Sequence, residues 1–262
     1  MTGRSSVSFT RPAHIDVELV KVAYHQRAFP VHIHQEHVIG VVEAGAEMLE
    51  VDDASHIISA GGMICLNPGQ PHSNRAIGDE CLRYRVFYLS PSLVASHLDQ
   101  DQMRFRAPSR PAAAETRRLL ALHRWFEHNA GDRLEEQSAI AEVIGIAFEA
   151  GATMVSEPQL PKLARLARDY IDEHYREGFG LDELALAAGA SKFHVARCFT
   201  RAYGLSPIAY RTQRRIHEAK RMILAGMPLA EVATDLSFAD QSHLTRHFQT
   251  LVGIAPGRYR EQ

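Results

Sequence analysis

Three histidines in the N-terminal third have the residue type and spacing that metal coordination requires. His32 and His34 lie two positions apart in FPVHIH, and His72 follows a Pro-Gly turn in NPGQPH. Residues two apart in a strand project from one face, so the sequence predicts that the first two imidazoles point together. Imidazoles in such an arrangement bind a divalent metal such as zinc, or they form a metal-free hydrogen-bonded cluster that lines a pocket. Both alternatives stay open.

A different chemistry is indicated near the C-terminus, where one pattern occurs twice. The stretch 181–211 recurs as 229–260, and the repeat pairs Arg197 with Arg246. Each copy is predicted to form two short helices around a tight turn. Arginine on the exposed N-terminal half of a helix suits guanine edges in the major groove, and the helix N-terminus favours phosphate. The duplication predicts two DNA-reading units at a fixed separation.

The turns and caps of these helices can be read from single residues. In the first copy a helix over 181–188 ends at Gly189, which tolerates a left-handed backbone, and Ser191 caps a second helix over 192–203. In the second copy Asp240 is the equivalent cap. One long helix over 210–225 joins the copies. Its arginines are available for phosphates or acidic neighbours: Arg211, Arg214, Arg215 and Arg221.

Composition is compatible with two soluble domains. The chain has 262 residues, of which 45% are hydrophobic and 23% charged. Residues 160–262 carry 15 Lys and Arg against 11 Asp and Glu, whereas residues 1–159 carry 14 against 20. A basic half beside an acidic half is typical of nucleic-acid binders. No secretory signal or membrane-spanning run is present, and three cysteines in apolar segments indicate a reducing, cytoplasmic location.

The pattern of elements predicts how these groups are positioned. Short alternating segments predict strands that form a small sandwich or barrel: 17–25, 38–45, 46–53, 56–62, 63–70 and 82–90. Residues 91–111 read as an irregular crossing, followed by amphipathic helices over 112–129 and 134–151. Periodicity stops in the Gly- and Pro-containing segment 151–161, which is the predicted linker, and helices dominate after it.

The C-terminal repeats resemble the DNA-binding domain of the AraC/XylS family of bacterial transcription regulators. The matching stretches are LDELALAAGASKFHVARCFTRAYGLSPIAYRTQRRIHEAKRMI and LAEVATDLSFADQSHLTRHFQTLVGIAPGRYR. The resemblance implies two helix-turn-helix subdomains that read adjacent major-groove segments. It places base-reading residues at Lys192, Phe193, Ala196, Arg197, Gln241, Ser242, Thr245 and Arg246. Ala196 is smaller than is usual in the family, and Ser237 stands where glycine is usual, so that turn is expected to be strained by about 1 kcal/mol.

The N-terminal region resembles the cupin-type, arabinose-binding-like sensor found in many such regulators. A His-x-His stretch, a Gly-containing hairpin and a Pro-Gly…His turn carry this resemblance. It implies an effector pocket with ligand-binding candidates His32, His34, His72, Tyr24 and Glu36. Arg27, His37 and Arg85 are further polar groups, but strand phase alone leaves the inner face undecided. Metal-dependent cupin enzymes usually carry a glutamate four or five residues after the second histidine, where this chain has Val38 and Ile39.

These observations predict an α+β, two-domain protein. A cupin-like barrel over 1–100 precedes a helical dimerisation or support region over 101–150, and after the linker an all-α domain over 162–262 holds both helix-turn-helix units, joined by a long helix. The predicted function is a cytoplasmic, non-enzymatic regulator that binds promoter or operator DNA, responds to a small-molecule effector, forms a homodimer and contacts RNA polymerase. Two alternatives remain: a metal-dependent cupin enzyme fused to a DNA-binding domain, and a helical protein-interaction module.

Overall fold

The computed structural model describes most of the chain. The described residues are 5–99, 103–111, 114–129, 131–149, 152–154 and 160–262. They divide into two compact units whose boundary falls between β12 (Ala152–Met154) and α4 (Lys162–His174). The residues Phe29–His32 group with the second unit, although their strand is hydrogen-bonded into a sheet of the first. An N-terminal sheet-rich domain is followed by a helical one, so the predicted fold class is confirmed.

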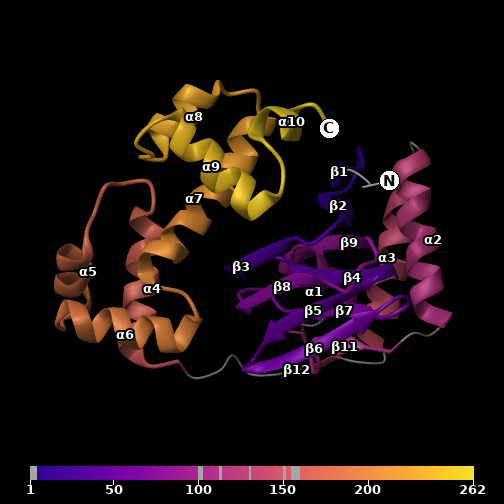
Figure 1. The fold of residues 1–262 in the computed structure, drawn as a ribbon, viewed down its shortest axis with the longest axis horizontal. Coiled ribbons are helices and arrows are strands. Elements are labelled where there is room, and N and C mark those ends of the chain that lie inside the picture. The colour runs from indigo at the N-terminus through magenta and orange to yellow at the C-terminus, as the bar shows by residue number, and fades with distance from the viewer. Residues whose placement is uncertain (1–4, 100–102, 112–113, 130, 150–151, 155–159) are drawn as a thin grey trace. The chain divides into compact units, whose positions relative to one another are not determined.

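The N-terminal unit is built from two main sheets (Figure 1). A six-stranded sheet has the order β1-β2-β9-β4-β7-β11, and a four-stranded sheet has the order β3-β8-β5-β6. The strands that precede β12 in the chain are β1 (Ser6–Thr10), β2 (Val17–Tyr24), β3 (Ala28–His32), β4 (His37–Ala44), β5 (Ala46–Val51), β6 (Ala54–Ser59), β7 (Met63–Leu66), β8 (His72–Ile77), β9 (Leu82–Leu89), β10 (Met103–Phe105) and β11 (Ser109–Arg110). Non-consecutive strands are neighbours in both sheets, so residues distant in sequence share one interior.

The pairing register separates the two faces of the six-stranded sheet. Lys21 pairs with Arg85 and Leu19 with Phe87 on one face, whereas Val22 pairs with Tyr84 on the other. Directly opposed residues of antiparallel strands project to the same side, and the side alternates along each strand. The face with Leu19 and Phe87 lies in the apolar core formed with the helices. The face with Tyr84 therefore points toward the barrel interior.

Two helices cover the outer face of this sheet. The helices α2 (Ala114–His128) and α3 (Arg133–Glu149) bury an apolar stripe against it. The fully buried residues of the stripes include Leu119, Ile140 and Val143. The stripe of α3 is thus occupied by the barrel, which gives this helix a supporting role. The dimerisation role expected for the same region stays a prediction.

Several local predictions differ from the structure. The segment 91–111, expected to be irregular, contains α1 (Pro91–Leu98), because Ser90 accepts a hydrogen bond from the Leu93 amide (3.2 Å) and proline is favourable in the first helical turn. Part of the predicted linker is β12, which pairs with β10. Residues 151 and 155–159 of that linker lie outside the described residues.

In the described range 160–262 every regular element is a helix. It contains α4, α5 (Leu181–Ala188), α6 (Lys192–Tyr203), α7 (Pro207–Leu224), α8 (Leu229–Asp235), α9 (Gln241–Val252) and α10 (Pro256–Arg260). The helix α7 runs from the group α4–α6 to the group α8–α10 (Figure 1). It begins three residues earlier than predicted because Ser206 caps it and Pro207 is in its first turn. None of the helices in the described residues is long and apolar enough to cross a membrane.

The turn of the second helix-turn-helix unit has the predicted strain. Ser237 has a φ of 50°, in the left-handed region where a side chain is disfavoured. Its hydroxyl donates to the Arg176 carbonyl at 2.5 Å. The equivalent turn of the first unit uses Gly189, with a φ of 67°. A hydrogen bond of about 1 kcal/mol therefore offsets a strain of similar size at Ser237.

This balance predicts different stabilities for two substitutions at Ser237. Ser237→Ala keeps the strain and loses the hydrogen bond, whereas Ser237→Gly loses both. We expect the alanine variant to be less stable than the glycine variant by about 1 kcal/mol. Urea unfolding followed by circular dichroism measures the difference, and equal stabilities of the two variants would contradict it.

Candidate nucleic-acid interface and effector site

The outer face of α6 carries the residues predicted to read DNA in the first unit. Val195 and Phe199 are buried and anchor the helix, while Phe193 is 77% exposed. Lys192 and Arg197 are also exposed, and Ala196 is half-buried at the edge of the face. The Lys192 ammonium lies 3.1 Å from the Asp182 carboxylate of α5.

The helix α9 presents the equivalent positions of the second unit. Leu244 and Phe248 are buried, so the predicted readers occupy the opposite side. Gln241, Ser242 and Arg246 are exposed and Thr245 is half-buried. Each of these four side chains can make a hydrogen bond, whereas the equivalent set on α6 contains Phe193 and Ala196.

Matched caps fix the N-termini of both helices. The Ser191 hydroxyl accepts from the His194 amide (3.4 Å), and the Asp240 carboxylate accepts from the His243 amide (2.7 Å). The His243 ring accepts from the Ala239 amide (3.3 Å) and its Nε2 lies 2.9 Å from Nε2 of His247. This histidine therefore contributes to the shape of the turn.

The four arginines of α7 that were candidates for phosphate binding all contact groups within the C-terminal unit. Arg215 donates to the carbonyls of Tyr175 (2.6 Å), Glu177 (2.8 Å) and Ser237 (3.1 Å). Burial, with a contribution from the charge of Arg211, lowers the pKa of Arg215 to about 10.

The other three arginines of α7 are also engaged within the C-terminal unit. Arg211 donates to the Phe179 carbonyl (2.6 Å), while Arg214 lies 2.8 Å from Asp172 and Arg221 lies 2.6 Å from Glu218. The alternative that these arginines meet acidic neighbours thus holds for Arg214 and Arg221. Arg211 and Arg215 bind backbone carbonyls in place of acidic neighbours, and the phosphate alternative for the arginines of this helix stays a prediction.

The three predicted imidazoles come together where β3 ends and β8 begins. Ligand nitrogens of His32, His34 and His72 all lie within 4.8 Å of one another. His32 and His72 are buried, and the His34 ring lies 5.0 Å from the Tyr88 ring and 5.2 Å from the His72 ring. The strand β3 ends at His32, so His34 follows the strand and does not lie on its face as predicted. The bend after β3 therefore brings the His34 ring close to the rings of His32 and His72.

Two of these rings have a defined orientation. Nδ1 of His32 lies 2.8 Å from the Pro30 carbonyl, and Nδ1 of His72 lies 3.0 Å from the Gln70 carbonyl. A carbonyl can only accept, so each Nδ1 carries a proton, and in the neutral form of either ring Nε2 keeps its lone pair. Burial also lowers the pKa of His32, which favours its neutral form. This is the arrangement in which histidine serves as a metal ligand.

A second polar group lies on the same inner face of the four-stranded sheet. Glu47 of β5 is 2% exposed and accepts a hydrogen bond from the Asn74 amide (3.3 Å). Burial raises the pKa of Glu47 to about 7. Tyr24 and Tyr84 contact each other edge to face with centroids 6.1 Å apart, and burial raises the pKa of Tyr24 to about 12.

The inner face therefore has polar groups toward both ends. Glu47 lies opposite Ala76, four residues along β8 from His72. That places it roughly 13 Å from the histidine along the strand. The wall between them includes Leu49 and Val86, which are both buried. A ligand inside the barrel would meet imidazoles at one end, and a carboxyl and phenols at the other.

Some polar candidates occupy other positions. Tyr24 faces inward with Tyr84, whereas Glu36 lies in the bend before β4 and is not part of the histidine group. His37 packs edge-on against Phe105 (5.7 Å) and Phe148 (5.2 Å) on the outer face. Burial lowers its pKa to about 4. Its interpretation as a ligand-facing group was wrong, because the phase of β4 points it toward α3.

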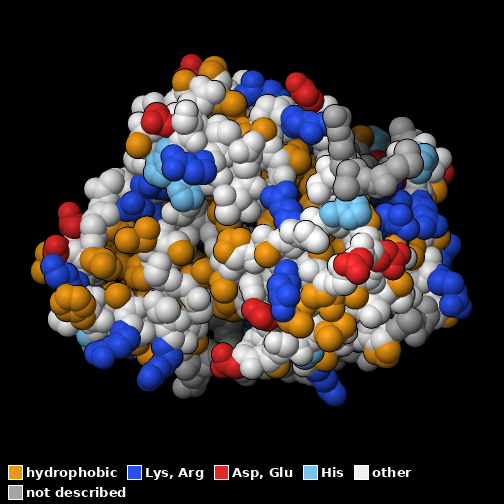
Figure 2. All heavy atoms as spheres, viewed as in Figure 1, with side chains coloured by type: hydrophobic (Ala, Val, Ile, Leu, Met, Phe, Trp, Pro, Cys, Tyr) orange, Lys and Arg blue, Asp and Glu red, His pale blue; other side chains and the backbone are white. Residues whose placement is uncertain are grey.

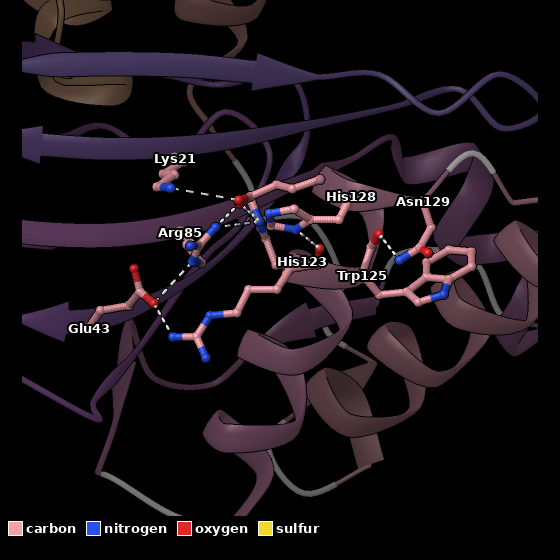
Figure 3. Close-up of polar contacts among 9 residues, drawn as sticks. Lys21, Glu43, Arg85, His123, Trp125, His128 and Asn129 are labelled. Carbon is pink, nitrogen blue, oxygen red and sulfur yellow. Dashed lines mark hydrogen bonds and ion pairs between the residues drawn. The ribbon is translucent and has the colours of Figure 1, made fainter.

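Arg85 is also on the outer face, in an ionic network between β9, β4 and α2 (Figure 3). Its guanidinium forms ion pairs with Glu43 (3.1 Å) and Glu127, and His123 lies 2.8 Å from Glu127. Burial and the charge of Arg85 lower the pKa of His123 to about 3, so the neutral ring donates to Glu127. Glu43 also binds Arg124 (2.6 Å). The network joins α2 to the sheet and is separated from the barrel interior by the strand itself.

Comparisons with known proteins agree with both halves of this geometry. A model of the AraC-like ligand-binding domain matches residues 14–144, and a helix-turn-helix domain model matches residues 184–262. The chain belongs to the AraC family. It is a DNA-binding transcription regulator with an N-terminal ligand-binding domain.

Two curated regulators are similar to this chain over most of their length. The uncharacterized HTH-type transcriptional regulator YbfI of Bacillus subtilis is 27% identical over 248 residues, which covers 88% of this chain and 86% of YbfI. The probable transcriptional regulator LumQ of Photobacterium leiognathi is 24% identical and covers 90% of this chain and 91% of LumQ. The crystal structure of ToxT from Vibrio cholerae O395 superposes with a TM-score of 0.57 at 12% identity, covering 98% of this chain and 97% of ToxT. This last likeness concerns the fold.

Within this AraC-family sensor, the inward-facing Glu47, Asn74, Tyr84 and Tyr88 were not among the candidates from the sequence. The alternation of AEMLEV and HSNRAI contained the signal, since Glu47 shares the phase of the apolar Leu49 and Val51. A carboxylate in an otherwise apolar strand face is rare unless it has a partner or a function. That contrast indicates a polar group inside the barrel.

The raised pKa of Glu47 predicts a pH dependence of stability. The folded state binds a proton more tightly than the unfolded state, so stability is highest below the unfolded pKa of 4.5 and falls as pH rises toward 7. We expect wild type to lose up to about 3 kcal/mol more than Glu47→Gln between pH 4.5 and pH 7.5. Glu50→Gln, on the exposed face of the same strand, is the matched control. Parallel pH profiles for wild type and Glu47→Gln would contradict the assignment.

Proposed function

We propose that α6 and α9 enter two successive segments of the major groove on one face of promoter or operator DNA. The single observation that carries this proposal is the equivalence of their outward positions on two identically placed, capped helices joined by α7. An 18-residue helix is about 27 Å long, comparable with the roughly 34 Å of one turn of duplex DNA. The base-reading residues are Lys192, Phe193, Ala196, Arg197, Gln241, Ser242, Thr245 and Arg246.

The effector site of this proposal is the interior of the N-terminal barrel. Polar groups from the imidazole end and from the Glu47 end give a small molecule hydrogen-bonding partners in a buried setting. Tyr24 belongs to this set, while Glu36 lies at its edge in the bend before β4. An effector that prefers one conformation of the protein changes DNA affinity, and DNA then changes effector affinity by the same factor.

The proposal includes no catalytic step. The relatives that match along most of this chain are transcription regulators, and the three histidines converge without a glutamate in their group among the described residues. Homodimerisation and contact with RNA polymerase belong to the proposal as partners of the regulator. The apolar stripe of α3 lies on the sheet, so a dimer would use other surfaces.

A divalent metal such as zinc is a second ligand that a specific observation favours. The two Nδ1–carbonyl contacts of His32 and His72 make Nε2 the nitrogen that each neutral ring can offer to a metal, and His34 converges on them. The residues thus fit a three-imidazole site. A bound metal would supply a Lewis-acidic centre and an open coordination position for an effector.

Arg246→Ala tests the second reading helix. We expect a loss of about 1–3 kcal/mol in binding to the cognate site and relaxed preference at one base pair, because the arginine reads a guanine edge. Fluorescence anisotropy with a full set of single-base operator variants measures both effects. Arg258→Ala, which removes an exposed arginine from α10, is the control for net charge. Unchanged affinity and unchanged base preference in a folded Arg246→Ala protein would show that Arg246 does not read a base.

His34→Ala tests the metal, because His34 is only half-buried and its loss should leave the fold intact. We expect wild type to bind about one zinc per chain with a rise in melting temperature, and the variant to lose both. Elemental analysis after dialysis and differential scanning calorimetry report these values. His25→Ala replaces an exposed histidine and serves as the control. Equal zinc content in wild type and His34→Ala would rule out this site.

A further inference from the structure

The exposed surface of the first reading helix is chemically different from that of the second. Phe193 is 77% exposed, and it occupies the position equivalent to Ser242 of α9. Ala196 is the equivalent of Thr245. Two hydrogen-bonding positions of the second helix are thus apolar in the first. Phenylalanine and alanine have no side-chain donor or acceptor, so they can contribute only apolar contact.

The position of Phe193 on α6 brings it to the base-reading end of the helix. It lies in the N-terminal turn, and the buried Val195 and Phe199 fix the opposite side against the core. Residues three and four apart are neighbours on a helix, so Phe193 forms one surface with Ala196 and Arg197. In helix-turn-helix proteins the N-terminal residues of the second helix meet the base edges.

Basic residues lie beside this apolar surface. Arg197 and Arg201 are exposed on the same helix, and the exposed Lys192 lies 3.1 Å from Asp182 of α5. Figure 2 shows hydrophobic and basic side chains gathered over α5 and α6. A positively charged rim complements the phosphates on both sides of a groove. The charge therefore favours duplex DNA as the occupant over an apolar surface of another protein.

The major groove offers one apolar group to such a surface. Thymine carries a C5-methyl group there, whereas the edges of guanine, adenine and cytosine present only donors and acceptors. We propose that the first helix-turn-helix unit reads thymine through its methyl group, with Phe193 as the contact and Ala196 leaving room for it. This specificity rests on the proposed seating of α6 in the major groove.

The geometry also locates the thymine. Phe193 and Arg197 are four residues apart, which is about 6 Å along the helix, and base pairs are stacked at about 3.4 Å. The thymine thus lies about two base pairs from the guanine read by Arg197. The second unit offers hydrogen-bonding side chains from Gln241, Ser242 and Arg246, and only the methyl group of Thr245 could contact a thymine methyl there.

The experiment removes one methyl group from DNA at a time. A binding site is first selected from random duplexes with the full-length protein, and each thymine in it is then replaced by deoxyuridine. Fluorescence anisotropy compares wild type with Phe193→Ala, which should fold because the side chain is exposed. We expect wild type to lose about fourfold in affinity at one thymine of the first half-site, as burial of one methyl group implies. Phe193→Ala should show no loss there.

Ser242→Ala is the matched control at the equivalent position of α9. It should retain the full deoxyuridine effect at the first half-site. The inference is overturned if wild type tolerates deoxyuridine at every protected thymine, or if Phe193→Ala keeps the fourfold loss. Unchanged affinity and unchanged methyl dependence in Phe193→Ala would assign the side chain to a protein partner, which also overturns it. The proposed function fails in a different way, when wild type selects no sequence at all.

Discussion

A buried guanidinium holds the DNA-binding unit in one geometry. Arg215 of α7 binds the carbonyls of Tyr175 and Glu177, which follow α4, and the carbonyl of Ser237, which lies in the turn of the second helix-turn-helix unit. A buried charge is tolerated only when its hydrogen-bonding capacity is satisfied, and removal of one partner is costly. One side chain therefore connects both subdomains to the helix between them. Two reading helices are useful only at a constant separation, which this connection provides.

The sensor domain relies on strand alternation for a comparable separation of roles. Along β9, Tyr84 points into the barrel while Arg85 points to α2, one residue further along the chain. The outer face combines an apolar core with the ionic network of Glu43, Arg85 and Glu127. The inner face collects imidazoles, phenols and a carboxyl with a raised pKa. The six-stranded sheet thus attaches the helices through its outer face and turns Tyr24 and Tyr84 inward, while His32, His72 and Glu47 belong to the four-stranded sheet.

The duplicated units share their framework and differ at the exposed positions that we propose to contact DNA. Caps, buried apolar residues and the final tyrosine of each copy are equivalent, and Ser237 replaces glycine at the strained turn with the help of a hydrogen bond. The outward positions are instead apolar in α6 and polar in α9. Framework positions are constrained by packing, while exposed positions can diverge because their substitution costs little stability.

The sequence alone determined the helical repeats, since caps, turns and helical periodicity are local properties that neighbouring residues decide. Helices α5 and α6 have their predicted limits for that reason. It also identified the three converging histidines. Only the tertiary structure decided which face of each strand is inside, because a period of two is symmetric between the faces until helices cover one of them. That choice moved Arg85 and His37 to the helix side and brought Glu47 and Tyr84 into the barrel. The carbonyl partners of Arg215 could not be predicted from the sequence either, since they lie about 20–40 residues away along the chain.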